Sequence, residues 1–228
     1  MSFKDLDIKL SYISCGEENI AKSFLIPTLK QAKSYKRSVG FFSSGVFDPI
    51  IDGIVALARN GGKIELIASP KLSEEDIKAI SLGYQKRDKI IEDAFSRDFI
   101  KEIEALDDIK LQLLVELIAN GTLDIKIAVT ESDGIYHDKL GIIEDFDGNI
   151  VVFYGSPNES QGGYKNNYEK IRVVKSWVAA ETESVADECR EFKSLWEGTN
   201  PFIKTYNYKE SAKANILEVI NTRKNASK

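Results

Sequence analysis

The chain has 228 residues, of which 43% are hydrophobic, and a formal net charge of −5. These values allow one domain with a substantial core and exclude a basic field over the whole surface, so any polyanion binding must be local. No apolar run approaches the ~20 residues of a membrane span, and the first residues lack the apolar run of a signal peptide. The two cysteines, without a CxxC or histidine-rich pattern, support neither disulfides nor a zinc site. We therefore expect a cytoplasmic protein with no metal, no other cofactor and no membrane contact.

The first predicted unit is a strand, a helix and a second strand over residues 37–69. Arg37 to Ser43 has the composition of a buried strand. Asp48-Pro49 then offers a helix N-cap followed by proline, and Gly61-Gly62 ends the helical spacing of apolar residues. Residues 63–68 form the next apolar run. Two strands joined by a helix in this way are expected to be parallel, which indicates an α/β fold.

The rest of the chain alternates between helical and extended patterns. A charged, mostly helical region is predicted from Ser73 to about Asn120. Four strands are predicted next, and they cover residues 124–129, 135–143, 149–154 and 169–174. The second and third are joined by a hairpin turn at residues 147–149. A helix, an extended segment and a final helix follow, over residues 181–196, 201–208 and 210–223. We predict a single domain over residues 1–228, with a core of about 37–196 and a C-terminal helical extension of about 200–228.

Five residues after the helical region have the chemistry of a phosphate-handling site. His137 is the only histidine, and Lys139 follows it within the predicted strand 135–143. Because alternate residues of an extended segment point to the same side, the imidazole and the ammonium should leave the strand together. Beyond the predicted hairpin, Ser156 and Asn158 add a hydroxyl and an amide, and Glu169 begins the next strand. Each residue alone is ordinary, and it is their order along the chain that predicts a site.

This order resembles the signature of the phospholipase D superfamily, which reads H-x-K, four residues, an acid, and then G-S-x-N. The acid at that spacing is Glu144 rather than the usual aspartate, with Asp145 as an alternative, and the gap to Gly155 is longer than usual. The resemblance implies a phospholipase D-like mixed β-sheet flanked by helices, with one motif copy per chain. Residues 41–47 and 192–196 also resemble the nuclease modules at the N-termini of DEAD/DEAH-type helicases and in metal-independent restriction enzymes.

The resemblance implies a metal-independent phosphodiesterase that works through a covalent phosphohistidine. His137 would attack phosphorus, Lys139 and Asn158 would hold the non-bridging oxygens, and Ser156 would add a hydroxyl donor. Glu169 would fix the orientation of the imidazole. The scheme needs a second histidine to protonate the leaving oxygen, and this chain has only one. We therefore expect a homodimer in which two copies of the chain form one active site.

Local composition favours a nucleic acid as the substrate. Residues 22–47 contain no acid and five basic residues, which are Lys22, Lys30, Lys33, Lys36 and Arg37. Tyr164, Lys165 and Asn166 lie in a glycine- and amide-rich stretch beside the motif, which suits phosphates and stacked bases but is also typical of a long turn. We predict a DNA endonuclease of restriction or defence type, with RNA as an alternative substrate. Two other functions stay open: a non-catalytic nucleic-acid-binding or dimerisation module of a larger helicase or restriction protein, and a hydrolase of lipids or small phosphodiesters.

Overall fold

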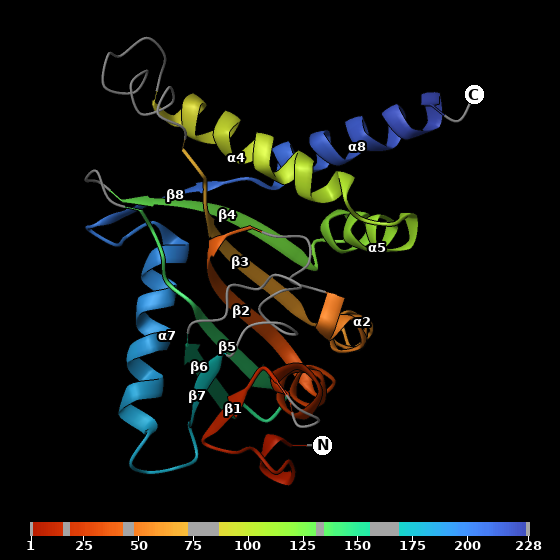
Figure 1. Cartoon of the computed structure of the whole chain (residues 1–228). Coiled ribbons are helices and arrows are strands. Elements are labelled where there is room, and N and C mark those ends of the chain that lie inside the picture. Colours follow the sequence, from red (N-terminus) through yellow and green to blue (C-terminus); the bar gives the residue numbers. More distant parts are fainter. Residues whose placement is uncertain are drawn as a thin grey trace.

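The computed structural model describes residues 2–15, 19–42, 48–72, 87–130, 135–155 and 169–226. Within these ranges an eight-stranded sheet forms the centre, with strand order β1-β7-β6-β5-β2-β3-β4-β8 (Figure 1). The strands are β1 Ser11–Ile13, β2 Ala32–Phe41, β3 Lys63–Ser69, β4 Leu123–Thr130, β5 Leu140–Asp145, β6 Ile150–Gly155, β7 Lys170–Lys175 and β8 Ile203–Asn207. The predicted mixed sheet flanked by helices is confirmed.

The parallel part of the sheet is its middle. Strands β2, β3 and β4 run parallel to one another, and the remaining neighbours are antiparallel. Between β2 and β3 the chain forms a 3-10 turn at Asp48–Ile50 and then helix α2, Ile51–Arg59. This confirms the strand, helix and strand predicted over 37–69. Strand β2 starts earlier than predicted, at Ala32, because its first residues already pair with β5 and, from Ser34, with β3.

Helices cover both faces of the sheet. One face is covered by α7, Thr182–Glu197, whose Val185, Phe192 and Leu195 pack on the sheet (Figure 1). The other face is covered by α1 Ile26–Leu29, α2, α4 Arg87–Glu104, α5 Asp108–Ala119 and α8 Lys209–Ala226. The predicted end of α7 is confirmed, since Gly198 has the left-handed φ of 70° that a glycine cap adopts. In the described part of the chain, no helix is both long and apolar enough to cross a bilayer.

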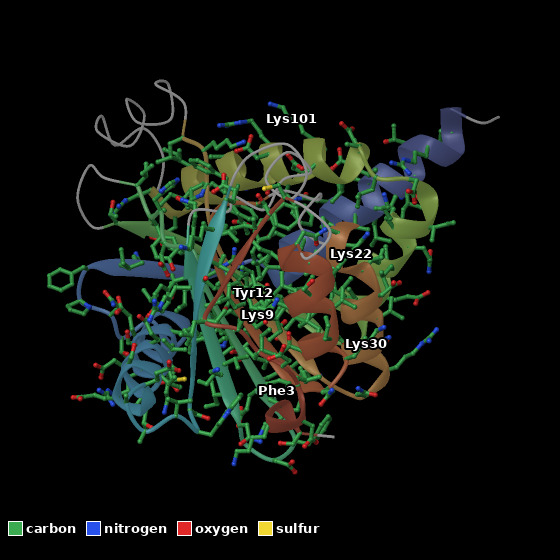
Figure 2. All side chains as sticks on the ribbon, turned by 60° about the horizontal axis from the view of Figure 1, so that its bottom comes forward. Phe3, Lys9, Tyr12, Lys22, Lys30 and Lys101 are labelled. Atoms are coloured by element: carbon green, nitrogen blue, oxygen red, sulfur yellow. The ribbon has the colours of Figure 1, made fainter. Side chains whose placement is uncertain are left out.

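The N-terminal segment contains structure that we did not predict. Strand β1 pairs with β7 at one edge of the sheet, and β8 forms the other edge beside β4, so the sheet extends beyond residues 37–196. A π-helical turn, Ala21–Leu25, leads directly into α1. Exposed Lys22 and Lys30 lie along this helical segment (Figure 2). Its buried side includes Phe24 and Leu29, which join the core against α2.

Candidate active site

His137 and Lys139 lie together just before the start of β5. The Lys139 Nζ is 3.1 Å from the His137 Nδ1 and 3.3 Å from its Nε2. The imidazole is exposed, while Lys139 is partly buried. The arrangement therefore places an accessible imidazole next to a cation, which suits nucleophilic attack on phosphorus.

The segment that carries both residues has no regular secondary structure. Strand β5 begins only at Leu140, so the predicted strand at 135–143 is wrong in its first five positions. The predicted alternation still holds. Tyr136 is buried on the α7 side of the sheet, where its hydroxyl donates to Asp138 over 3.4 Å, and His137 and Lys139 leave the segment together. Burial of Tyr136 replaces strand pairing as the anchor of this segment.

Arg37 lies beneath the site, on the face of the sheet opposite α7. Its side chain is only 2% exposed, and its guanidinium lies 5.2 Å from the centre of the Phe153 ring. The ring occupies the space above Gly141, where an added Cβ would be 2.1 Å from the ring's Cζ. Arg37 pairs with Gly141 across β2 and β5. Arg37, the Phe153 ring and Gly141 thus pack against one another on the face of the sheet opposite α7.

Burial and neighbouring charges set the electrostatics of Lys139. Burial lowers the pKa of Lys139, and the guanidinium of Arg37 lowers the pKa further. The carboxylates of Asp138 and Glu169 act in the opposite direction. Coulombic effects of this kind require the charges to be near one another. Arg37 of β2, Lys139 before β5 and Glu169 before β7 therefore lie near one another and form a charged cluster.

Glu169 is held at the start of β7 by the N-terminal segment. Its backbone N–H donates to the Ser14 Oγ over 2.8 Å, and its carbonyl accepts from the Ser14 N–H over 2.9 Å. Ser14 is buried and follows β1 directly. The edge strand that we did not predict therefore fixes the backbone that carries the predicted carboxylate. The hydrogen bond predicted between Glu169 and the His137 ring stays a prediction.

Gly155, which precedes the Ser-x-Asn part of the motif, is required by strand packing. A Cβ there would be 2.3 Å from the carbonyl oxygen of Lys170 and 3.0 Å from the Cα of Ile171. Both contacts are with the backbone of β7, which cannot move without opening the sheet. The next predicted site residues, Ser156 and Asn158, and the predicted nucleic-acid-binding residues Tyr164, Lys165 and Asn166 lie outside the described residues.

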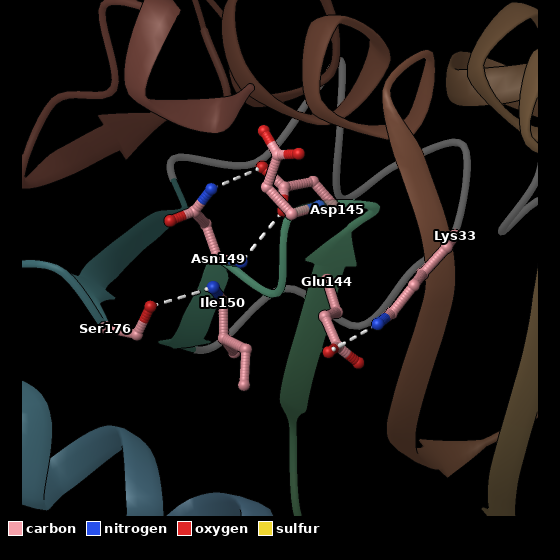
Figure 3. Close-up of polar contacts among 7 residues, drawn as sticks. Lys33, Glu144, Asp145, Asn149, Ile150 and Ser176 are labelled. Atoms are coloured by element: carbon pink, nitrogen blue, oxygen red, sulfur yellow. Dashed lines mark hydrogen bonds and ion pairs between the residues drawn. The ribbon is translucent and has the colours of Figure 1, made fainter. Parts of the chain in front are cut away.

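The two candidates for the acid of the motif lie at the far end of β5, away from His137. Glu144 forms an ion pair of 2.8 Å with Lys33, and both side chains are partly exposed (Figure 3). Asp145 is fully buried, and its carboxylate accepts from the backbone N–H groups of Phe3, Asp147 and Asn149 and from the Asn149 side chain (Figure 3). Asp145 thus ties the β5–β6 turn to the N-terminus, a supporting role rather than a chemical one.

We expect Asp145→Asn to lower the free energy of unfolding by about 2–4 kcal/mol, because it points an amide group at N–H donors that need an acceptor. Burial raises the pKa of Asp145, but the hydrogen bonds to the carboxylate lower it by more. The pKa therefore lies below its ordinary value of 3.8. The stabilisation should therefore be complete above about pH 4 and disappear as the pH falls through the lowered value. Urea unfolding at several pH values measures both effects.

Glu144→Gln provides the matched control for this prediction. Glu144 is adjacent to Asp145 and also carries a carboxylate, but its ion pair with Lys33 is partly exposed. The change should therefore cost less than about 1 kcal/mol. Equal destabilisation by the two variants would show that Asp145 does not hold the turn.

The basic residues of segment 22–47 do not form one surface. Lys33 pairs with Glu144, and Lys36 lies over the Phe192 ring of α7 with its Nζ 5.9 Å from the ring centre. Arg37 faces the opposite side of the sheet, over Phe153. Lys22 and Lys30 are exposed on the helical segment before β2. Alternation along a strand separates neighbours in sequence, so only Arg37 of this group lies beside Lys139.

Sequence reasoning missed two residues next to the imidazole. Gly40, near the end of β2, lies against the His137 ring, and the Phe41 ring centre is 6.2 Å from that of His137 in an edge-on arrangement. A glycine inside a buried apolar strand is itself a signal of close approach by another group. Among the described residues, no group of three or more His, Cys, Asp or Glu side chains could hold a metal ion.

Comparison with known proteins identifies the family. A family model described as "Cardiolipin synthase, PLD-like domain" matches residues 25–196. The chain belongs to the phospholipase D-like family. The match includes Arg37, His137, Lys139 and Glu169, so these residues lie inside the family domain. No curated protein sequence matches the chain.

The chain is also similar to several solved structures. The chain is similar to phosphatidylserine synthase from Haemophilus influenzae, with a TM-score of 0.54 and 12% identity over 93% of this chain and 45% of that one. It is also similar to NucT from Helicobacter pylori, with 18% identity and a TM-score of 0.46. That match covers 82% of this chain and 94% of NucT. A third similar structure is Nuc from Salmonella typhimurium, a phospholipase D family member. Its sequence is 14% identical, the TM-score is 0.48, and the match covers 87% of this chain and 95% of Nuc.

Proposed function

We propose that the chain is a metal-independent phosphodiesterase, acting as a DNA endonuclease of restriction or defence type through a covalent phosphohistidine in a homodimer. The observation that supports this most directly is the Lys139 Nζ within 3.1 Å of the His137 Nδ1. An exposed imidazole with an adjacent ammonium, inside a phospholipase D-like domain, is suited to attack on a phosphodiester.

In this scheme a ring nitrogen of His137 attacks phosphorus and the bond to the leaving oxygen breaks. The leaving oxygen takes a proton from His137 of the second copy, which then removes a proton from water. That water attacks the phosphohistidine, the nitrogen–phosphorus bond breaks, and the imidazole is released. Lys139 would neutralise the charge that develops on the non-bridging oxygens. Arg37, at 2% exposure, would act on the same charge from beneath rather than by direct contact.

The remaining predicted roles belong to the same proposal. Ser156 and Asn158 would bind the phosphate, and Glu169 would orient the imidazole. Tyr164, Lys165 and Asn166 would contact the nucleic acid beside the scissile bond. The cytoplasmic location, the single-domain boundary and the association with a helicase or restriction protein stay predictions.

We expect cleavage of DNA to persist in excess EDTA, because the nucleophile is an imidazole and the stabilising charges are side-chain cations. The assay uses labelled single- and double-stranded DNA and RNA, with and without chelator. A metal-dependent nuclease in the same buffers confirms that the chelator is effective. Loss of cleavage in EDTA that added magnesium or manganese restores would contradict the mechanism.

We expect mixed dimers to be inactive, since one active site needs His137 from both copies. Wild-type chains mixed with an excess of His137→Ala chains under exchanging conditions should lose more activity than dilution explains. Mixing with Ile135→Ala chains, which change an exposed residue two positions away, is the control and should leave the activity unchanged. A monomer by sedimentation that cleaves at full rate would exclude the shared site.

A lipid phosphodiester is the second candidate substrate. The family model is described as a cardiolipin synthase domain, and phosphatidylserine synthase has the same fold. The EDTA assay therefore includes phospholipid vesicles beside the nucleic acids. Release of a lipid headgroup without cleavage of DNA or RNA would favour this candidate. Binding of DNA without cleavage of any substrate would favour a non-catalytic binding module.

A further inference from the structure

Gly40 leaves just enough room for the His137 ring against the backbone of β2. A Cβ added to Gly40 would be 2.7 Å from the His137 Cδ2, 3.1 Å from its Nε2 and 3.5 Å from its Cγ. A distance of 2.7 Å is shorter than real Cβ contacts, so any larger residue at position 40 must displace the imidazole. The ring lies against bare backbone at this position.

The glycine is not required by its own backbone conformation. Among the described residues, the glycines with positive φ are Gly61, Gly121, Gly148 and Gly198, and Gly40 is not one of them. Gly40 instead lies at a β-bulge, where Val39 pairs with Ala68 and Phe41 pairs with Ser69, so that Gly40 is the additional residue on β2. Bulges of this kind redirect a strand beside a site. The reason for glycine here is therefore the room it gives to the ring.

Two further contacts limit where the ring can lie. The Phe41 ring meets it edge-on, at a centroid distance of 6.2 Å and an interplanar angle of 63°. The Lys139 Nζ lies beside both ring nitrogens. Gly40, Phe41 and Lys139 thus lie around one imidazole, and two of them come from the end of β2.

We propose that Gly40 is a positioning residue, which sets the direction of the His137 nucleophilic nitrogen by allowing the ring to lie against β2. Its effect on catalysis rests on the function proposed above, but its effect on the ring does not. A displacement of about 1 Å of a reacting group can cost about 100-fold in rate. A methyl group at position 40 should therefore impair the chemical step more than substrate binding.

We expect Gly40→Ala to change the free energy of unfolding little, because the added Cβ would meet only the His137 ring. The His137 ring is exposed and lies on a segment outside the strands, so it can move without opening the core. At Gly141 and Gly155, by contrast, a Cβ would meet the buried Phe153 ring or the backbone of β7. Gly40→Ala should thus separate an effect on the site from an effect on folding, which those two glycines cannot do.

Nuclear magnetic resonance can follow the ring without any substrate, because the chain has one histidine. We expect Gly40→Ala to shift the single imidazole Cε1–H signal, and to lower kcat about 100-fold with little change in KM. Gly53→Ala is the matched control: its Cβ would be 2.9 Å from the Leu29 Cβ, between α1 and α2. This control should lower the melting temperature and leave the imidazole signal in place.

A double variant keeps the test decisive if Gly40→Ala is unstable. If the lost stability comes from the ring, it should be recovered in Gly40→Ala/His137→Ala, where the ring is absent. An unchanged imidazole signal, or instability that the double variant does not relieve, would overturn the proposal. A shifted signal with unchanged kcat would overturn its catalytic part. A shifted signal in a protein whose wild type cleaves nothing would support the contact with Gly40 and contradict the proposed function instead.

Discussion

His137→Ala should reduce phosphodiester cleavage by at least about 10³-fold, because it removes the nucleophile for which the chain has no substitute. Stability should change little, since the ring is exposed and lies outside the strands. Single-turnover cleavage measures the first effect and urea unfolding the second. When the reaction with labelled DNA is quenched without acid and run on a denaturing gel, wild type should show a labelled, acid-labile protein–DNA adduct. The variant should show none.

Ile135→Ala is the control for this prediction. Ile135 is 62% exposed and lies on the same segment, two residues earlier. It should retain wild-type cleavage, which excludes a general effect of shortening an exposed side chain there. Cleavage by His137→Ala at the wild-type rate would contradict the mechanism, and unfolding of the variant would show that the histidine has a structural role.

Lys139→Met should lower kcat by about 10²–10³-fold, because methionine keeps much of the aliphatic stem but removes the charge that stabilises the transition state. KM should change less, since the charge on phosphate increases as the reaction proceeds. Lys30→Met is the matched control, as Lys30 is an exposed lysine on a helical segment. Equal losses in the two variants would indicate general charge attraction of the substrate rather than a role of Lys139 in the site.

The pH dependence gives an independent check on Lys139. Burial and the Arg37 guanidinium lower the pKa of Lys139 below its usual 10.5. A rising pH should therefore remove the ammonium, and with it activity, earlier than for an exposed lysine. In Lys139→Arg the guanidinium stays charged, so whatever activity remains should lose this alkaline decline. An alkaline decline that is the same in both proteins would assign it to another group.

The sequence by itself determined the elements that depend on local signals. The glycines at 61–62 set the end of α2 and Gly198 set the end of α7, because caps are made by residues next to one another. The predicted start of the helix at Asp48-Pro49 is wrong, since these residues form a 3-10 turn and α2 begins at Ile51 without a side-chain cap. The order of His137, Lys139, Gly155, Ser156 and Asn158 predicted the family, which the family model confirms. The pairing of β5 with β6 also followed from the short turn between them.

Only the tertiary structure decided which of these residues meet. It placed Arg37 near Lys139 but Lys36 over the Phe192 ring of α7, and it brought Gly40 of β2 against His137 of the segment before β5. It also separated buried Asp145 from ion-paired Glu144, which are adjacent and chemically alike. The physical reason is that contacts between strands distant in sequence depend on sheet order and register. Those are properties of the packed chain, and spacing along one sequence does not contain them.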